Sequence, residues 1–174
     1  MIRSARFLTA LLAIIIVSGC ATFGTSGGEG RWARVTLRKL TLRQKIGQMM
    51  VHHMNMHFLN NETAQWHELE KLLTTDGIGG VHVWYGDAGT SLTMMNQMQK
   101  LSNLPILFDA DIERGLGQRY PAGSHLPPLM AIAATNNPAN AYEAGRITAL
   151  EGQAAGIHFN LGPVVDVNNN PANP

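Results

Sequence analysis

Two carboxylates and an arginine follow an apolar, strand-like segment in the middle of the chain. Asp109 and Asp111 are one residue apart, and Arg119 comes eight residues after Asp111. Because strand side chains alternate, both acids should leave the strand on one face while Ala110 turns to the other. A carboxylate accepts hydrogen bonds from hydroxyl groups, and an arginine can hold either ligand oxygens or the acids themselves. The pattern favours a polar pocket at the end of a strand.

A purely structural explanation of the same residues is also open. Asp111 would then cap a solvated turn, and Arg119 would pair with Glu113. A second segment, residues 156–171, favours the pocket because it repeats the design and places polar residues, Asp166 among them, after an apolar stretch.

Together, these segments resemble the N-terminal domain of the family 3 glycoside hydrolases, the β-N-acetylhexosaminidases and β-glucosidases that remove sugars from non-reducing ends. The resemblance covers about residues 40–174 and is carried by four motifs in the family order. They are L-T-L-R-Q-K-I-G-Q-M at residues 40–49, G-I-G-G-V at 77–81, D-x-E-x-G-x-x-Q-R at 111–119 and P-V-V-D-V-N-x-N-P at 163–171.

The resemblance implies an enzyme that hydrolyses O-glycosidic bonds by a retaining mechanism, removing β-linked N-acetylhexosamine from non-reducing ends. A β-glucosidase of the same family is one alternative, and a non-catalytic saccharide-binding or structural envelope lipoprotein is another. The implied partner is a β-linked oligosaccharide, glycoside or muropeptide-type substrate, and no cofactor is expected.

The resemblance also assigns roles to particular residues. It implies that Asp111 accepts hydrogen bonds from hydroxyls of the non-reducing sugar and that Arg119 lines the same subsite. Direct substrate contacts by Glu113, Gln118 or Asp166 are less well supported, since each could equally hold the loops. The family's nucleophile and acid/base belong to later segments. We therefore expect no catalytic residue in this chain, which we interpret as a fragment, and no activity from it alone.

The composition is that of a globular protein, with 45% hydrophobic and 14% charged residues. The chain has 13 basic and 12 acidic residues, and two of the basic ones, Arg3 and Arg6, precede an apolar run at residues 7–17. That run is too short to span a bilayer but suits the core of a signal peptide. Once Arg3 and Arg6 are left out, the rest of the chain has no excess of basic over acidic residues. Nucleic acid is therefore excluded as a partner.

The N-terminal segments predict export and lipid anchoring. Val17-Ser18-Gly19-Cys20 resembles a bacterial lipoprotein cleavage box, and Cys20 is the only cysteine. We divide the chain into a signal peptide at residues 1–19, a lipidated cysteine with a flexible tether at 20–36, and the barrel segment at 37–174. Acylation of Cys20 would anchor the protein to the cell envelope. In the lipoprotein class that this segment resembles, an aspartate after the cysteine favours retention in the inner membrane. Ala21 stands there instead, so the resemblance implies the outer membrane in a cell that has one.

From residue 40 onward, helical and strand-like stretches alternate, which favours parallel βα units. Thr41 should cap the first helix, with Gln44 completing a capping box. Further helices are predicted at residues 62–74, 92–101 and 139–155, and strands at 81–84, 104–108 and 159–165. A complete (β/α)8 barrel needs roughly 250 residues. The predicted fold class is therefore α/β, a partial TIM (β/α)8 barrel comprising roughly the first half.

Two patterns that could bind metal are set aside. His53 and His57 would share a helix face, but the glutamate of a zinc protease motif is missing. Residues 166–170 resemble the start of a calcium loop, yet Pro171 stands where glycine is required. No metal site is predicted.

Overall fold

The computed structural model describes residues 28–166, 169, 170 and 172, so the predicted signal peptide and Cys20 lie outside the described residues. The chain divides into two units, with the boundary between Leu40 and Thr41. In the first unit, helix α2 (Gly28–Lys39) occupies residues for which we predicted a flexible tether up to residue 36. Basic residues in its last turn, Arg38 and Lys39, favour the helix because they face the negative end of its dipole.

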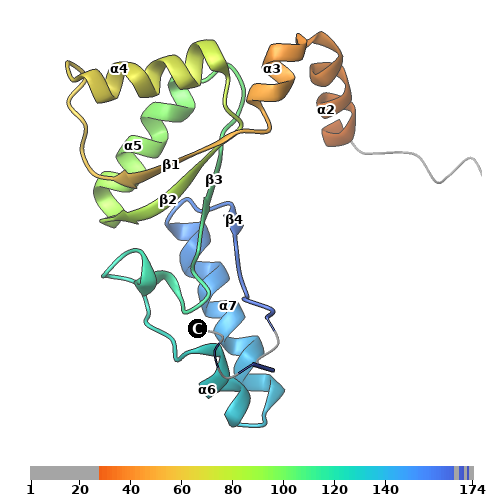
Figure 1. The fold of residues 1–174 in the computed structure, drawn as a ribbon, viewed down its shortest axis with the longest axis vertical. Coiled ribbons are helices and arrows are strands. Elements are labelled where there is room, and N and C mark those ends of the chain that lie inside the picture. Colours follow the sequence, from red (N-terminus) through yellow and green to blue (C-terminus); the bar gives the residue numbers. More distant parts are fainter. Residues whose placement is uncertain (1–27, 167–168, 171, 173–174) are drawn as a thin grey trace, which may run out of the picture. The chain divides into compact units, whose positions relative to one another are not determined.

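The second unit is built on a parallel sheet in which the strands lie in the order of the sequence (Figure 1). Its strands are β1 (Val51–Met56), β2 (Gly80–Gly86), β3 (Leu107–Ala110) and β4 (Phe159–Asn160). Its helices are α3 (Leu42–Gly47), α4 (Ala64–Lys71) with a π-helical turn at Leu72–Asp76, α5 (Ala88–Leu101), α6 (Leu129–Ala134) and α7 (Pro138–Ala154), and a 3-10 turn covers Leu116–Gln118. Parallel strands joined through helices confirm the predicted α/β class.

Local signals located several helix ends correctly. Thr41 and Gln44 form the predicted capping box of α3. The Asn137 side chain accepts a hydrogen bond from the Ala139 amide at the start of α7, and Gly156, with φ of 78°, follows its end. These signals work because each depends on residues that are neighbours in the sequence.

Three strands differ from the prediction. Strand β3 begins and ends later than the strand predicted at 104–108. No strand is predicted at β1, because Val51 is the single residue in V-H-H-M-N-M of a type common in strands. The predicted strand at 159–165 is only two residues long. Gly162 and Pro163 follow closely, and proline has no amide hydrogen to donate to a sheet ladder.

The main hydrophobic core lies on one face of the sheet. Alternate strand residues such as Val81, Val83 and Phe108 are fully buried there. They pack with α4 and α5, which Figure 1 shows alongside β1 and β2. The core also contains Met54, Met56, Trp66, Leu69, Leu73, Met94 and Met98. Residues at the intervening strand positions, among them His82 and Asp109, point to the opposite face, which would be the interior of a barrel.

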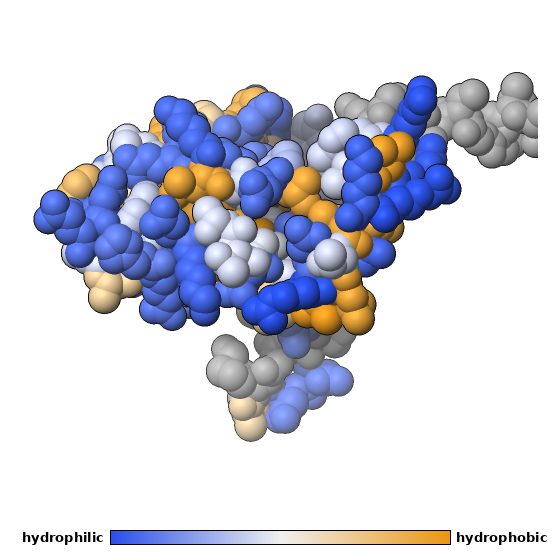
Figure 2. All heavy atoms as spheres, turned by 90° about the horizontal axis from the view of Figure 1, so that it is seen from above, coloured by the Kyte–Doolittle hydropathy of each residue, from blue (hydrophilic) through white to orange (hydrophobic). Residues whose placement is uncertain are grey.

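The surface of the molecule is mainly hydrophilic in the view of Figure 2, with hydrophobic residues in separate patches. Among the helices that the structure describes, none combines the length and the apolar character that crossing a bilayer requires.

Candidate functional site

The polar residues predicted to form a pocket gather at the carboxyl edge of the sheet. Asp109 lies on β3 and Asp111 directly follows it. Both carboxylates face one imidazole, that of His82 on β2. Its Nδ1 is hydrogen-bonded to Asp109 Oδ1, and its Nε2 lies 3.8 Å from Asp111 Oδ2. The two acids therefore share a face, as strand alternation predicts, while Ala110 is fully buried on the other side.

Arg119 binds Asp111 through two separate contacts. Its Nε donates to the main-chain oxygen of Asp111 at 2.9 Å, and its Nη2 donates to Oδ2 at 3.0 Å. The arginine side chain is only 6% exposed, whereas that of Asp111 is 31% exposed. The alternative pairing of Arg119 with Glu113 is thus wrong, because the intervening loop turns the arginine back onto the strand end.

Gly115 allows this loop to turn. Its φ is 81°, a left-handed conformation that disfavours other residues. A Cβ at this position would also lie 2.4 Å from the main-chain oxygen of Ser124. Gln118 holds the same loop by accepting a hydrogen bond from the Arg114 amide at 3.1 Å. The glycine and Gln118 of the motif therefore shape the loop that presents Asp111.

Trp84 supports the arginine from the neighbouring strand. The Arg119 guanidinium carbon lies 4.0 Å from the centre of the Trp84 ring, close enough for a cation–π interaction. Trp84 is two residues after His82 on β2, so the two side chains project from the same face. The buried cation is consequently held between an aromatic ring and a carboxylate.

His82 and Trp84 were not identified as site residues from the sequence. A signal was available, since a histidine inside a buried strand needs a hydrogen-bond partner. The identity of that partner was not available. His82 is opposite Asp109 only because β2 and β3 pair in the register that aligns them.

Other candidate residues lie outside this cluster. Asp166 is exposed and well past the end of β4. Asn160, at the end of β4, accepts a hydrogen bond from the Ile112 amide at 3.1 Å and so joins the tips of β3 and β4. His53 lies on β1, so the helical spacing that would pair it with His57 for a metal does not exist. Within the described part of the chain, no group of three or more potential ligands could hold a metal ion.

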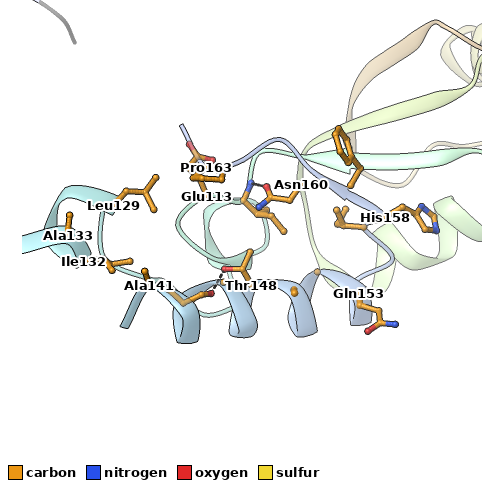
Figure 3. Close-up of a pocket in the computed structure, with 17 residues that line it drawn as sticks. Glu113, Leu129, Ile132, Ala133, Ala141, Thr148, Gln153, His158, Asn160 and Pro163 are labelled. Atoms are coloured by element: carbon orange, nitrogen blue, oxygen red, sulfur yellow. Dashed lines mark hydrogen bonds between the residues drawn. The ribbon is translucent and has the colours of Figure 1, made fainter. Parts of the chain in front are cut away.

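A separate groove of about 890 Å³ runs between α6, α7 and the segment that follows β4. Figure 3 shows Glu113, Asn160 and Pro163 across this groove from α7. Most of its lining is alanine, glycine, leucine and isoleucine. Sugar hydroxyls need polar partners, so this groove is a poorer match to a saccharide than the edge that carries Asp111.

The chemistry available at the Asp111 edge is that of binding. Asp109 is 7% exposed and its carboxylate is engaged by His82. Asp111 uses Oδ2 for Arg119, and among the described residues no hydrogen bond engages its Oδ1. One carboxylate oxygen is thus oriented by a fixed cation while the other can accept from a ligand. Nearby, burial raises the pKa of the Tyr120 hydroxyl, despite an opposing contribution from Ser91.

Comparison with known proteins places the chain in a family. Residues 41–174 match the family model described as "Glycosyl hydrolase family 3 N terminal domain". A curated relative from Cellulomonas fimi, named "Beta-N-acetylglucosaminidase/beta-glucosidase", is 28% identical over 143 residues, which are 82% of this chain and 24% of that protein.

Two solved structures share the fold. One, titled "Beta-glucoside phosphorylase BglX bound to 2FGlc", has a TM-score of 0.74 at 24% identity. The match covers 88% of this chain and 27% of the chain in that structure. The other, "Beta-glucoside phosphorylase BglX", has a TM-score of 0.70 at 25% identity. That match covers 88% of this chain and 26% of the chain in that structure. The chain thus spans about a quarter of the length of the proteins it matches, and its fold is confirmed as part of a barrel of this type.

Proposed function

Because the chain belongs to glycosyl hydrolase family 3 through the N-terminal domain, we propose that its Asp111 edge binds the non-reducing sugar of a β-linked glycoside. The observation that carries the proposal is the Asp111 carboxylate, oriented by buried Arg119 and left with one oxygen for a ligand. An ionised carboxylate makes strong, directional hydrogen bonds to hydroxyl groups. Such bonds position the sugar for bond cleavage.

The sugar we propose is N-acetylhexosamine, and β-glucoside is the alternative. The double name of the Cellulomonas fimi relative supports both. Asp111, oriented by Arg119, would address hydroxyl groups that the two sugars share, so selection between them would depend on residues outside this cluster.

Cleavage would proceed by a retaining mechanism in a complete active site. Such enzymes need a carboxylate nucleophile and an acid, with retaining carboxyl pairs about 5 Å apart. Asp109 is unsuited to either role because it is buried and bound to His82. We therefore assign binding to this segment and catalysis to other segments of the family domain. The purified 174-residue chain should release no nitrophenol from nitrophenyl β-glycosides, and robust turnover would overturn the assignment.

Saccharide binding can be tested in the chain itself. Saturation-transfer NMR would compare the methyl β-glycosides of N-acetylglucosamine, glucose and galactose. We expect the N-acetylglucosaminide to bind most tightly. Tighter binding of the glucoside would favour the alternative, and binding of none of the three would overturn the proposed function. Asp111→Asn should remove the signal.

The matched control is Asp76→Asn. Asp76 is also a carboxylate paired with an arginine, Arg43, but it precedes β2 and so lies at the opposite edge of the sheet. Its substitution should leave saccharide binding unchanged. A non-catalytic binder or envelope lipoprotein would bind the same saccharides. The enzyme is distinguished from it by measuring glycoside turnover in a protein that carries the remaining segments of the family domain.

The location of the protein is a further proposal. We propose that Cys20 is acylated and anchors the protein to the bacterial envelope, with the outer membrane as the expected site. The support is the cleavage box at residues 17–20 and the apolar run before it. Cells fed radiolabelled palmitate should label the protein, and Cys20→Ser should abolish the label. Labelling that persists in the variant would contradict the anchor.

A further inference from the structure

The barrel-facing side of the sheet carries a row of polar residues beneath Asp111. His53 on β1, His82 on β2 and Asp109 on β3 are aligned by the strand register. Inward-facing layers of such barrels are dominated by branched apolar residues. A histidine and a carboxylate in adjacent positions of this layer therefore need an explanation other than packing.

The row fixes the orientation of the His82 ring. Asp109 Oδ1 engages Nδ1, and the His53 ring stacks on His82 with centroids 5.6 Å apart and planes 25° apart. The side chain of His82 is 13% exposed and that of Asp109 is 9% exposed. An imidazole held on one nitrogen and along one face has little freedom, so its second nitrogen points in a set direction.

That second nitrogen points at Asp111. Nε2 of His82 lies 3.8 Å from Oδ2, the same oxygen that accepts from Arg119 Nη2 at 3.0 Å. The Asp111 carboxylate is thus flanked by Arg119 on one side and His82 on the other. At 3.8 Å the contact with His82 is electrostatic and steric rather than a direct hydrogen bond.

Resting on the proposed function, we propose that His82 and Asp109 form a positioning pair that sets the orientation of Asp111 for saccharide binding. Asp109 holds His82, His82 limits the rotation of the Asp111 carboxylate, and Oδ1 is thereby presented to the ligand. His82 and Asp109 are positioning residues, since neither is assigned a contact with the sugar. A pair that served only to stabilise the fold would affect folding without a selective effect on affinity.

Two substitutions of His82 separate these roles. In His82→Asn, the side-chain amide nitrogen takes the place of Nδ1, so Asp109 keeps a donor while the group facing Asp111 is lost. His82→Ala removes both. Positioning predicts that both variants bind the methyl β-glycoside about tenfold more weakly. It also predicts that His82→Asn retains the thermal midpoint better than His82→Ala.

The opposite result would assign a structural role. If His82→Asn keeps both the stability and the affinity of the unmodified chain, the pair only supplies a hydrogen-bond donor to the buried Asp109 carboxylate. The positioning inference would then be overturned. Asp109→Asn should lower affinity by a similar factor, because it releases the ring. The matched control is His158→Asn. His158 Nδ1 accepts from the Phe108 amide beside β3, and its substitution should not change affinity.

A spectroscopic measurement keeps the inference testable even where no saccharide binds. Imidazole ¹⁵N spectra of the 174-residue chain would report His82 directly. Asp111→Asn should shift the Nε2 signal and Asp109→Asn the Nδ1 signal. If Asp111→Asn leaves both nitrogens unchanged, the pair is not coupled to Asp111 and the inference fails. Absent saccharide binding with intact coupling would instead count against the proposed function alone.

Discussion

Two arginine–aspartate pairs lie at opposite edges of the same sheet and differ in which partner is buried. At the amino edge, Arg43 and Asp76 are 2.6 Å apart, and their side chains are 77% and 23% exposed. At the carboxyl edge, Arg119 is buried and Asp111 is the more exposed partner. A long, exposed arginine side chain contributes little to stability or order. A buried arginine stacked on Trp84 can instead hold a carboxylate in place and present it outward.

The largest expected difference between the two pairs is in stability. Arg119→Met should lower the free energy of unfolding by about 3 kcal/mol, because it removes two hydrogen bonds to Asp111 and the contact with Trp84 from a buried position. Arg43→Met should cost less than about 1 kcal/mol, as is typical of exposed pairs. Urea unfolding of both variants measures the difference. Equal losses would show that the two pairs are equivalent.

The next effect is on ligand affinity. Asp111→Asn should weaken saccharide binding by about tenfold or more, since a charge-assisted hydrogen bond is replaced by a neutral one. The free energy of unfolding should also fall, because the substitution leaves the buried Arg119 cation without its carboxylate partner. Titration by calorimetry or ligand-observed NMR gives the affinity. An unchanged affinity would remove Asp111 from the binding site.

A smaller effect should follow from loss of the aromatic support. Trp84→Leu removes the cation–π contact with Arg119 and should cost about 1 kcal/mol of stability beyond the change in buried area. Combining it with Arg119→Met in a double-mutant cycle isolates the interaction. No equivalent coupling is expected between Trp84 and Arg43. Strict additivity of the Trp84 and Arg119 substitutions would show that the stacking has no energetic role.

The smallest effect is confined to high pH. Burial raises the pKa of Tyr120, which follows Arg119 directly, above its usual value of 10.0. Between pH 10 and that raised pKa, the unfolded chain loses the tyrosine proton while the folded chain keeps it, so stability falls as pH rises. Tyr120→Phe should reduce this decline. Unfolding curves for both proteins above pH 9 would reveal it, and parallel pH dependences would contradict it.

Short-range features of the fold could be predicted from the sequence. The capping box of α3, the start and end of α7 and the shared face of Asp109 and Asp111 all depend on residues close together in the chain. Strand β1 is not predicted because its sequence, V-H-H-M-N-M, contains a single usual strand former, Val51. Its stability comes from pairing with β2 and from packing against the core, neither of which is visible locally.

The residue types by themselves predicted that Asp109 and Asp111 share one face at the end of β3, because strand alternation is a local property. Only the tertiary structure decided that Arg119 binds Asp111 rather than Glu113 and that His82 stands between two acids. The register of β2 against β3 brings His82 to Asp109 across 27 positions of sequence. That register is set by the packing of many distant side chains, so no short segment contains it.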